Sequence, residues 1–136
     1  AKTKTAATVK ANGYGLGAEN IAEALADAGC TEFFVANLGE AITLRQHLDG
    51  RGHSKPHIMT LHGCQSDQQD DHLAFRITPV LNDLEQLSRW RLFSQRQSNR
   101  LPAMLHIDTG MTRLGFDTDY NGQGLGFYDP SVLLPD

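Results

Sequence analysis

The sequence has little cysteine and no excess of positive charge, and each shortage excludes a class of protein. The two cysteines among 136 residues, Cys30 and Cys64, are too few for a disulfide scaffold and lack metal-ligand spacing. We therefore predict a cytoplasmic protein with reduced thiols and no metal site. The formal net charge of -4 and the pI near 5.8 give no basic surface of the kind that binds nucleic acid.

Long hydrophobic runs are also missing. Runs such as residues 33–36 are far too short to span a bilayer, and the first residues carry no signal segment with a charged start and an apolar centre. Hydrophobic residues make up 40% of the chain and charged residues 21%, as in ordinary globular proteins. With 136 residues, we expect one domain that binds neither membrane nor nucleic acid.

Short apolar stretches alternate with stretches of helical periodicity. Alternating strands and helices with short links predict an α/β fold, in which parallel strands are joined by right-handed crossovers. This pattern alone does not choose between a closed barrel and an open sheet. We predict strands at 6–9, 32–37, 57–63, 76–82 and 103–108, and helices at 18–28, 39–50, 66–75 and 83–95.

Local signals support several of these boundaries. Gly29 and Gly50 follow or end apolar helical patterns, where glycine commonly stops a helix. Asn82 or Asp83 can cap the helix that follows. Pro79 lies awkwardly inside a predicted strand, because proline donates no hydrogen bond to a neighbouring strand.

A lysine and three glycines stand where the first predicted strand passes into a helix. Gly13, Gly15 and Gly17 do not match the G-x-G-x-x-G dinucleotide fingerprint, and a simple tight turn explains them equally well. Lys10 stands at the strand end, which is the ligand face of parallel α/β folds. A desolvated lysine there can form a Schiff base with a carbonyl, although a solvated flank is the simpler interpretation of an isolated lysine.

A second motif, HIDTGMTRLGF at residues 106–116, follows the last predicted strand. Residues 108–110 form a polar turn, and Arg113 just beyond it can bind an anionic oxygen. The D-T-G triplet also occurs in aspartic proteases, but those chains are rich in strands, whereas this one alternates strands with helices.

Taken together, VKANGYGLGA (9–18) and HIDTGMTRLGF (106–116) resemble the motifs of the alanine racemase family. FFVANLGEAITLR and ITPVLNDLEQLSRW between them look like the second and fourth units of that family, so that the resemblance covers about residues 5–116. Other barrels that bind pyridoxal phosphate, including those like ornithine decarboxylase, match the first motif less well and the second hardly at all.

The resemblance implies a TIM-type (β/α)8 barrel that binds pyridoxal phosphate and interconverts L- and D-alanine, which supplies D-alanine for peptidoglycan. It implies that Lys10 holds the cofactor as a Schiff base and acts as a catalytic base. Tyr14 would bind the cofactor phosphate, and Arg113 would contact the cofactor's phenolic oxygen near the substrate. The family works as a homodimer, and its opposite-face base is a tyrosine from the partner subunit.

Two departures from the family bear on these expectations. His106 stands where many members have a lysine, often carbamylated, that steadies the arginine. Only about the first four to five barrel units are found, in residues 1–116, and residues 117–136 form an unassigned tail rich in glycine and aspartate. We therefore interpret the chain as an N-terminal fragment. The alternative is a remnant that binds pyridoxal phosphate, or is purely structural, without turnover.

Overall fold

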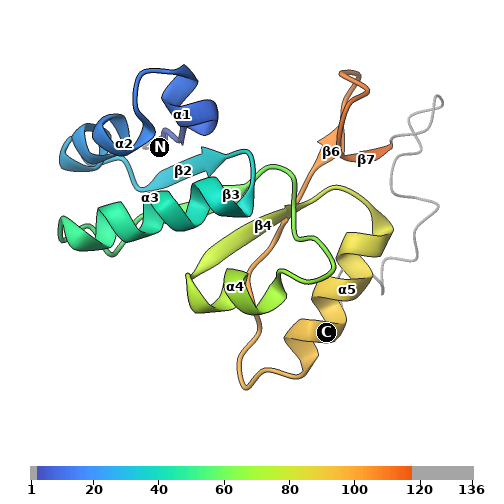
Figure 1. The fold of residues 1–136 in the computed structure, drawn as a ribbon. Helices are drawn as coiled ribbons and strands as arrows, with labels where there is room; N and C mark the ends of the chain where they lie inside the picture. The colour runs from blue at the N-terminus through green and yellow to red at the C-terminus, as the bar shows by residue number, and fades with distance from the viewer. Residues whose placement is uncertain (1–2, 118–136) are drawn as a thin grey trace.

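The sheet at the centre of the molecule has five parallel strands that follow one another in chain order, as the computed structural model of residues 3–117 shows (Figure 1). A sequential order without reversal is that of a TIM-barrel wall, whereas the order of a doubly wound sheet reverses at a switch point. The predicted α/β class is confirmed, and the strand order favours the barrel type. The strands are β1 (Ala7–Thr8), β2 (Glu32–Val35), β3 (His57–Thr60), β4 (Ile77–Leu81) and β5 (Met104–Leu105).

Helices follow the strands in alternation. Figure 1 shows α3 alongside β2 and β3, and α4 beside β4. Within residues 3–117, no helix is long and apolar enough to cross a membrane. The segments assigned as helices are α1 (Lys10–Tyr14), α2 (Ala18–Asp27), α3 (Leu38–Gly50), α4 (Gln69–Ala74) and α5 (Leu84–Gln95).

Capping residues explain where two helices begin, although only the cap of α5 was predicted. Asn37 precedes α3, and its side-chain oxygen accepts a hydrogen bond from the backbone N–H of Glu40 at 3.1 Å. Asp83 does the same for α5, accepting from the N–H of Gln86 at 2.8 Å. Each cap satisfies one of the backbone donors that a helix leaves unpaired in its first turn. Asp83, and not Asn82, is thus the cap of α5.

The fifth predicted strand, residues 103–108, is divided. Its first part, β5, pairs with β4, and its second part, β6 (Ile107–Asp108), pairs in parallel with β7 (Phe116–Asp117) in a separate two-stranded sheet. His106 lies at the division and still donates its N–H to Leu81 O, at 3.0 Å. The expectation of one continuous strand was therefore wrong, because residues beyond His106 pair with a later segment and not with β4.

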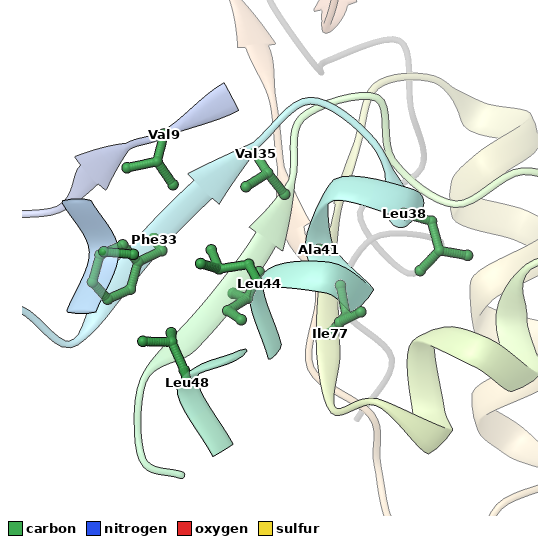
Figure 2. Packing of buried hydrophobic residues seen from close by; sticks show 10 residues of the cluster. Val9, Phe33, Val35, Leu38, Ala41, Leu44, Leu48 and Ile77 are labelled. Atoms are coloured by element: carbon green, nitrogen blue, oxygen red, sulfur yellow. The ribbon is translucent and has the colours of Figure 1, made fainter. Parts of the chain in front are cut away.

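Two apolar clusters hold the fold together. The larger one packs α2 and α3 against the first four strands, and Figure 2 shows the α3 side chains beside those of β2 and Val9. The buried residues of α3 recur at helical spacing, as the sequence predicts. The members with 7% exposure or less are Val9, Ala22, Phe33, Val35, Leu38, Ala41, Leu44, Leu48, Ile58 and Ile77.

The smaller cluster lies around α5. It contains Cys64, Leu81, Leu87, Trp90 and Phe116, all buried. Leu84, the first residue of α5, lies outside this cluster, and its side chain is 38% exposed.

Pro79 does lie inside β4, opposite Thr60 of β3. Pairing of β4 with β5 begins only at Val80, so the ladder to β5 requires no donor from the proline. Residues 118–136, and with them most of the predicted tail, lie outside the described residues.

Candidate active site

Lys10 lies at the carboxyl end of β1, where the parallel strands point. Val9 just before it is buried and donates its N–H to Phe34 O at 2.9 Å, which keeps the strand paired up to the lysine. Lys10 itself is half-buried and lines a cavity of about 560 Å³. Ligand pockets typically measure about 300–1,000 Å³, so this one is large enough for a small cofactor.

The cavity joins the two predicted motifs. Lys10 comes from the start of the described chain and Arg113 from its end, and both line the same cavity. His62, Gln65 and Gln86 add polar groups, and no acidic side chain lines this cavity within residues 3–117. Because Lys10 and Arg113 carry positive charge and no carboxylate among the described residues lines the cavity, the cavity favours an anionic ligand.

The segment after Lys10 is a left-handed turn. Ala11, Asn12, Gly13 and Tyr14 all have φ between 52° and 61°. The sequence predicted only that glycines would interrupt regular structure there. Three of these four residues carry a Cβ, and a left-handed conformation costs about 1–2 kcal/mol for each such residue. The turn therefore stores strain beside the lysine, and other contacts must hold it.

Hydrogen bonds on several sides hold this turn. The N–H of Gly13 donates to Val9 O at 2.9 Å, and the N–H of Gly17 donates to Asn12 O at 2.9 Å. The Asn12 side-chain oxygen accepts from the N–H of Ala18 at 3.0 Å, at the start of α2. Asparagine tolerates the left-handed region better than most residues because its side chain can bond nearby backbone in this way.

Tyr14 does not join Lys10 and Arg113. Its side chain is 64% exposed and is not among the residues that line the cavity. It lies at the end of the left-handed turn, just before the glycines that lead into α2. Its assignment to the cofactor phosphate stays a prediction.

Asp108 shapes the loop that carries Arg113. One carboxylate oxygen accepts the backbone N–H groups of Gly110, at 2.9 Å, and of Thr112, at 3.0 Å. These hydrogen bonds stabilise the charged form and hold the pKa of Asp108 below its ordinary value, with the bond from Gly110 the larger cause. The loop connects β6 to its parallel partner β7, and Arg113, which lies in this loop, lines the cavity.

His106 has a defined neighbour in Asn82. The Nδ2 group of Asn82 donates to Leu61 O and to Val80 O, both at 2.9 Å. Its Oδ1 is therefore the atom that faces Nδ1 of His106, at 2.8 Å. An amide oxygen only accepts, so Nδ1 carries a proton and, in the neutral ring, Nε2 keeps a lone pair. This pair ties His106 to the ends of β3 and β4.

Sequence reasoning missed three residues of this region. Asn82 was considered only as a helix cap, and Gln86 was not considered at all. Glu40 was part of a helical stretch, yet it follows Asn37 by three residues, and an acidic residue at that distance from a cap is a known helix-start signal. That spacing is the one sequence signal that could have identified it.

A second cavity, of about 360 Å³, lies toward the opposite ends of the strands. We assign it a structural role, because its buried arginine bonds to backbone carbonyls. Arg45, Lys55, His72 and Trp90 are among the residues that line it. The Arg45 guanidinium donates to Pro56 O at 2.7 Å and to Phe75 O at 3.2 Å, and burial lowers its pKa. This arginine links the segments that precede β3 and β4 through hydrogen bonds to their backbone carbonyls.

Comparison with known proteins identifies the family. The family model "Alanine racemase, N-terminal domain" matches residues 1–123. The chain belongs to the alanine racemase N-terminal domain family. The Brucella suis alanine racemase is 47% identical over 117 residues, which are 85% of this chain and 28% of that protein. A catabolic alanine racemase from Agrobacterium fabrum is 43% identical over 86% of this chain and 29% of its own length.

Solved structures show the same relationship. The alanine racemase from Bartonella henselae with covalently bound pyridoxal phosphate aligns with a TM-score of 0.82 and 34% identity, over 98% of this chain and 37% of that one. The alanine racemase from E. faecalis aligns with a TM-score of 0.72 and 31% identity, over 91% and 33%. The chain therefore spans roughly three tenths of the length of the curated family members it matches, and the structure contains the first part of their barrel.

Proposed function

We propose that this chain is part of an alanine racemase that uses pyridoxal phosphate to interconvert L- and D-alanine. The observation that carries the proposal is the meeting of Lys10 and Arg113 in one cavity at the carboxyl ends of the strands. Membership of the alanine racemase family supports the choice of reaction, since the family relatives named above are alanine racemases.

The residues present fit pyridoxal phosphate. The cofactor has an aldehyde, a phenolic oxygen and a phosphate, which call for an amine and for positive or N–H-bearing partners. Lys10 supplies the amine, Arg113 supplies a guanidinium, and no carboxylate among residues 3–117 lines the cavity to repel the anion. The solved Bartonella henselae relative carries its pyridoxal phosphate covalently bound.

Each residue has a distinct part in the proposed chemistry. The bound cofactor supplies an electron sink that stabilises negative charge at the substrate α-carbon. Lys10 holds the cofactor through its Nζ and takes or returns the α-proton on one face of the substrate. Arg113 would supply a positive charge to the cofactor's phenolic oxygen, and Tyr14 would bind the phosphate. His106, held by Asn82, supports the segment from which the Arg113 loop departs.

Racemisation also needs a proton donor on the opposite face. We propose that a tyrosine of a partner subunit supplies it, in a cytoplasmic homodimer that produces D-alanine for peptidoglycan. Tyr14 is the only tyrosine among residues 3–117, and Tyr120 and Tyr128 lie outside them. Without a positioned second base, the rate falls by about 10²–10⁴-fold. The chain by itself should then exchange the α-proton of one alanine enantiomer faster than it forms the other enantiomer.

The test has two stages. Pyridoxal phosphate is added to the chain, borohydride fixes any lysine adduct, and peptide masses locate it, with Lys10→Ala as the control. We expect the adduct on Lys10, whereas labelling of Lys4 or Lys55 instead would contradict the proposal. Proton exchange in heavy water, with chiral analysis of the alanine, then separates a catalytic chain from one that only binds the cofactor.

A further inference from the structure

Glu40 connects the ends of two strands at the site. It lies in the first turn of α3, and its Oε1 accepts the backbone N–H of Ala11 at 2.9 Å. Its Oε2 accepts the backbone N–H of Ala36, just after β2, at 2.7 Å. Both carboxylate oxygens are therefore engaged with backbone donors, and hydrogen bonds to an ionised acceptor are stronger than neutral ones.

The bond to Ala11 falls within the left-handed turn. Ala11 follows Lys10 directly and is the first residue of the left-handed turn, with φ of 52°. An alanine in this conformation costs about 1–2 kcal/mol relative to a right-handed one. Without a partner for its N–H, this peptide would lower its free energy by relaxing out of the left-handed region. That rotation would redirect the adjoining Lys10.

We propose that Glu40 is a positioning residue for Lys10, because its carboxylate holds the Lys10–Ala11 peptide in the conformation that keeps the lysine amine in the cavity. The inference deepens the proposed function and depends on it, since the consequence for chemistry exists only if Lys10 is the reactive amine. Glu40 itself contacts backbone and is not among the residues that line this cavity.

A role confined to the start of α3 is the competing explanation. Asn37 already caps this helix through the N–H of Glu40, so the helix start does not depend on the Glu40 side chain alone. The bond to Ala36 belongs to that local arrangement, but the bond to Ala11 crosses to another strand end, 29 residues away in sequence. Only the positioning role predicts a change in the behaviour of Lys10.

The choice of substitutions follows from the two oxygens. Glu40→Gln keeps the shape but has one acceptor oxygen, and its NH₂ group would face the other backbone N–H. Glu40→Ala removes both acceptors. Glu19→Gln is the matched control. Glu19 lies in the first turn of α2, and it and Glu40 both line a third cavity, of about 260 Å³, which is separate from the Lys10 cavity. The control therefore removes the same charge close to Glu40.

The experiment measures how readily Lys10 is labelled by pyridoxal phosphate. The amine nitrogen bonds to the aldehyde carbon, the aldehyde oxygen leaves as water, and borohydride reduces the resulting C=N bond so that peptide masses can be read. Loss of a hydrogen bond to a charged group corresponds to about a 10- to 100-fold change in an equilibrium constant. We expect the affinity for adduct formation at Lys10 to fall by that factor in Glu40→Ala and Glu40→Gln, and to stay unchanged in Glu19→Gln.

A second readout needs no cofactor. Hydrogen exchange of the peptide that contains Ala11 should accelerate about 10- to 100-fold in both Glu40 variants, under conditions where urea titration shows them fully folded. If Lys10 labels normally in these variants, or if exchange at Ala11 is unchanged, the inference is wrong. If the unaltered chain fails to label Lys10, the proposed function fails, and the exchange measurement still decides whether Glu40 holds the turn.

Discussion

Replacement of Gly63 by alanine should strongly destabilise the chain, because Gly63 lies where two elements approach very closely. It follows β3 and has φ of +73°, a left-handed conformation. A Cβ built on it would lie 1.9 Å from Gln86 Oε1, 2.8 Å from Gln86 Cδ and 2.9 Å from Val80 O. The first two contacts involve a side chain that can move. The third involves the backbone of a central strand, which cannot move independently.

The expected magnitude has two parts. The left-handed conformation costs an alanine about 1–2 kcal/mol relative to glycine. Inserting a methyl group into a filled space costs about 1–3 kcal/mol more. Displaced Gln86 would also lose its bonds to Asn82 N, at 3.3 Å, and to His62 O, at 3.4 Å, which are long and therefore weak. Gly63→Ala should thus lower the free energy of unfolding by about 2–5 kcal/mol.

Gly52→Ala separates the two parts. Gly52 has a similar φ of +84°, but no atom lies within 4 Å of its virtual Cβ, so only the conformational cost of about 1–2 kcal/mol applies. Urea titration followed by circular dichroism gives both values. The double variant Gly63→Ala/Gln86→Ala removes the side-chain clash but leaves the contact with Val80 O, so it should recover only part of the loss. Equal destabilisation by Gly63→Ala and Gly52→Ala would refute the close approach.

Three further predictions concern single side chains. Tyr14→Phe should weaken binding of pyridoxal phosphate by about 0.5–3 kcal/mol if the hydroxyl binds the phosphate; an unchanged dissociation constant would place the phosphate elsewhere. Burial raises the pKa of Cys64 to about 11, so iodoacetamide at about pH 8 should modify half-buried Cys30 first, as peptide masses would show. Burial lowers the pKa of His72 below 6.5, so the unfolded chain binds more protons than the folded one below that pH. Unfolding free energy should therefore fall as the pH drops through about 6.5 and below, and His72→Gln should lessen that dependence.

The order of elements was predictable because it depends on local patterns. The α3 side chains at Ala41, Leu44 and Leu48 recur at helical spacing and are all buried. Asp83 caps α5, and α2 ends two residues before Gly29, which has φ of +94°. Each of these signals acts within one helix or at its end, and each helix forms as its signal predicts.

The strained turn was not predictable, because its cause lies elsewhere in the chain. The glycines after Lys10 indicate a break in regular structure, but they do not indicate that Ala11 and Asn12 also adopt the left-handed region. In that conformation Ala11 donates its N–H to Glu40, which is distant in sequence. The division of the fifth strand at His106 has the same origin, since it requires pairing of Ile107 with Phe116.

The candidate site was partly predictable for a related reason. Lys10 and Arg113 stand in motifs whose residue types suggest chemistry, and the structure brings the two together. Gln86 and Asn82 stand in no such motif. Their side chains reach the cavity region only because β4 and α5 end and begin beside it, so only the packed structure reveals them.

The loop that carries Arg113 is held by Phe116 and Gly115, neither of which has a reactive side chain. Phe116 is buried with Cys64, Leu81 and Trp90, which anchors the C-terminal end of the loop to the α5 cluster. A Cβ at Gly115 would lie 2.9 Å from His106 O and 2.9 Å from Asp108 N, so only glycine allows β7 to lie this close to β6. The loop between Asp108 and Gly115 is thus fixed at both ends. A loop backbone fixed in this way loses little freedom when Arg113 binds an anion, and this is a property that a preorganised site requires.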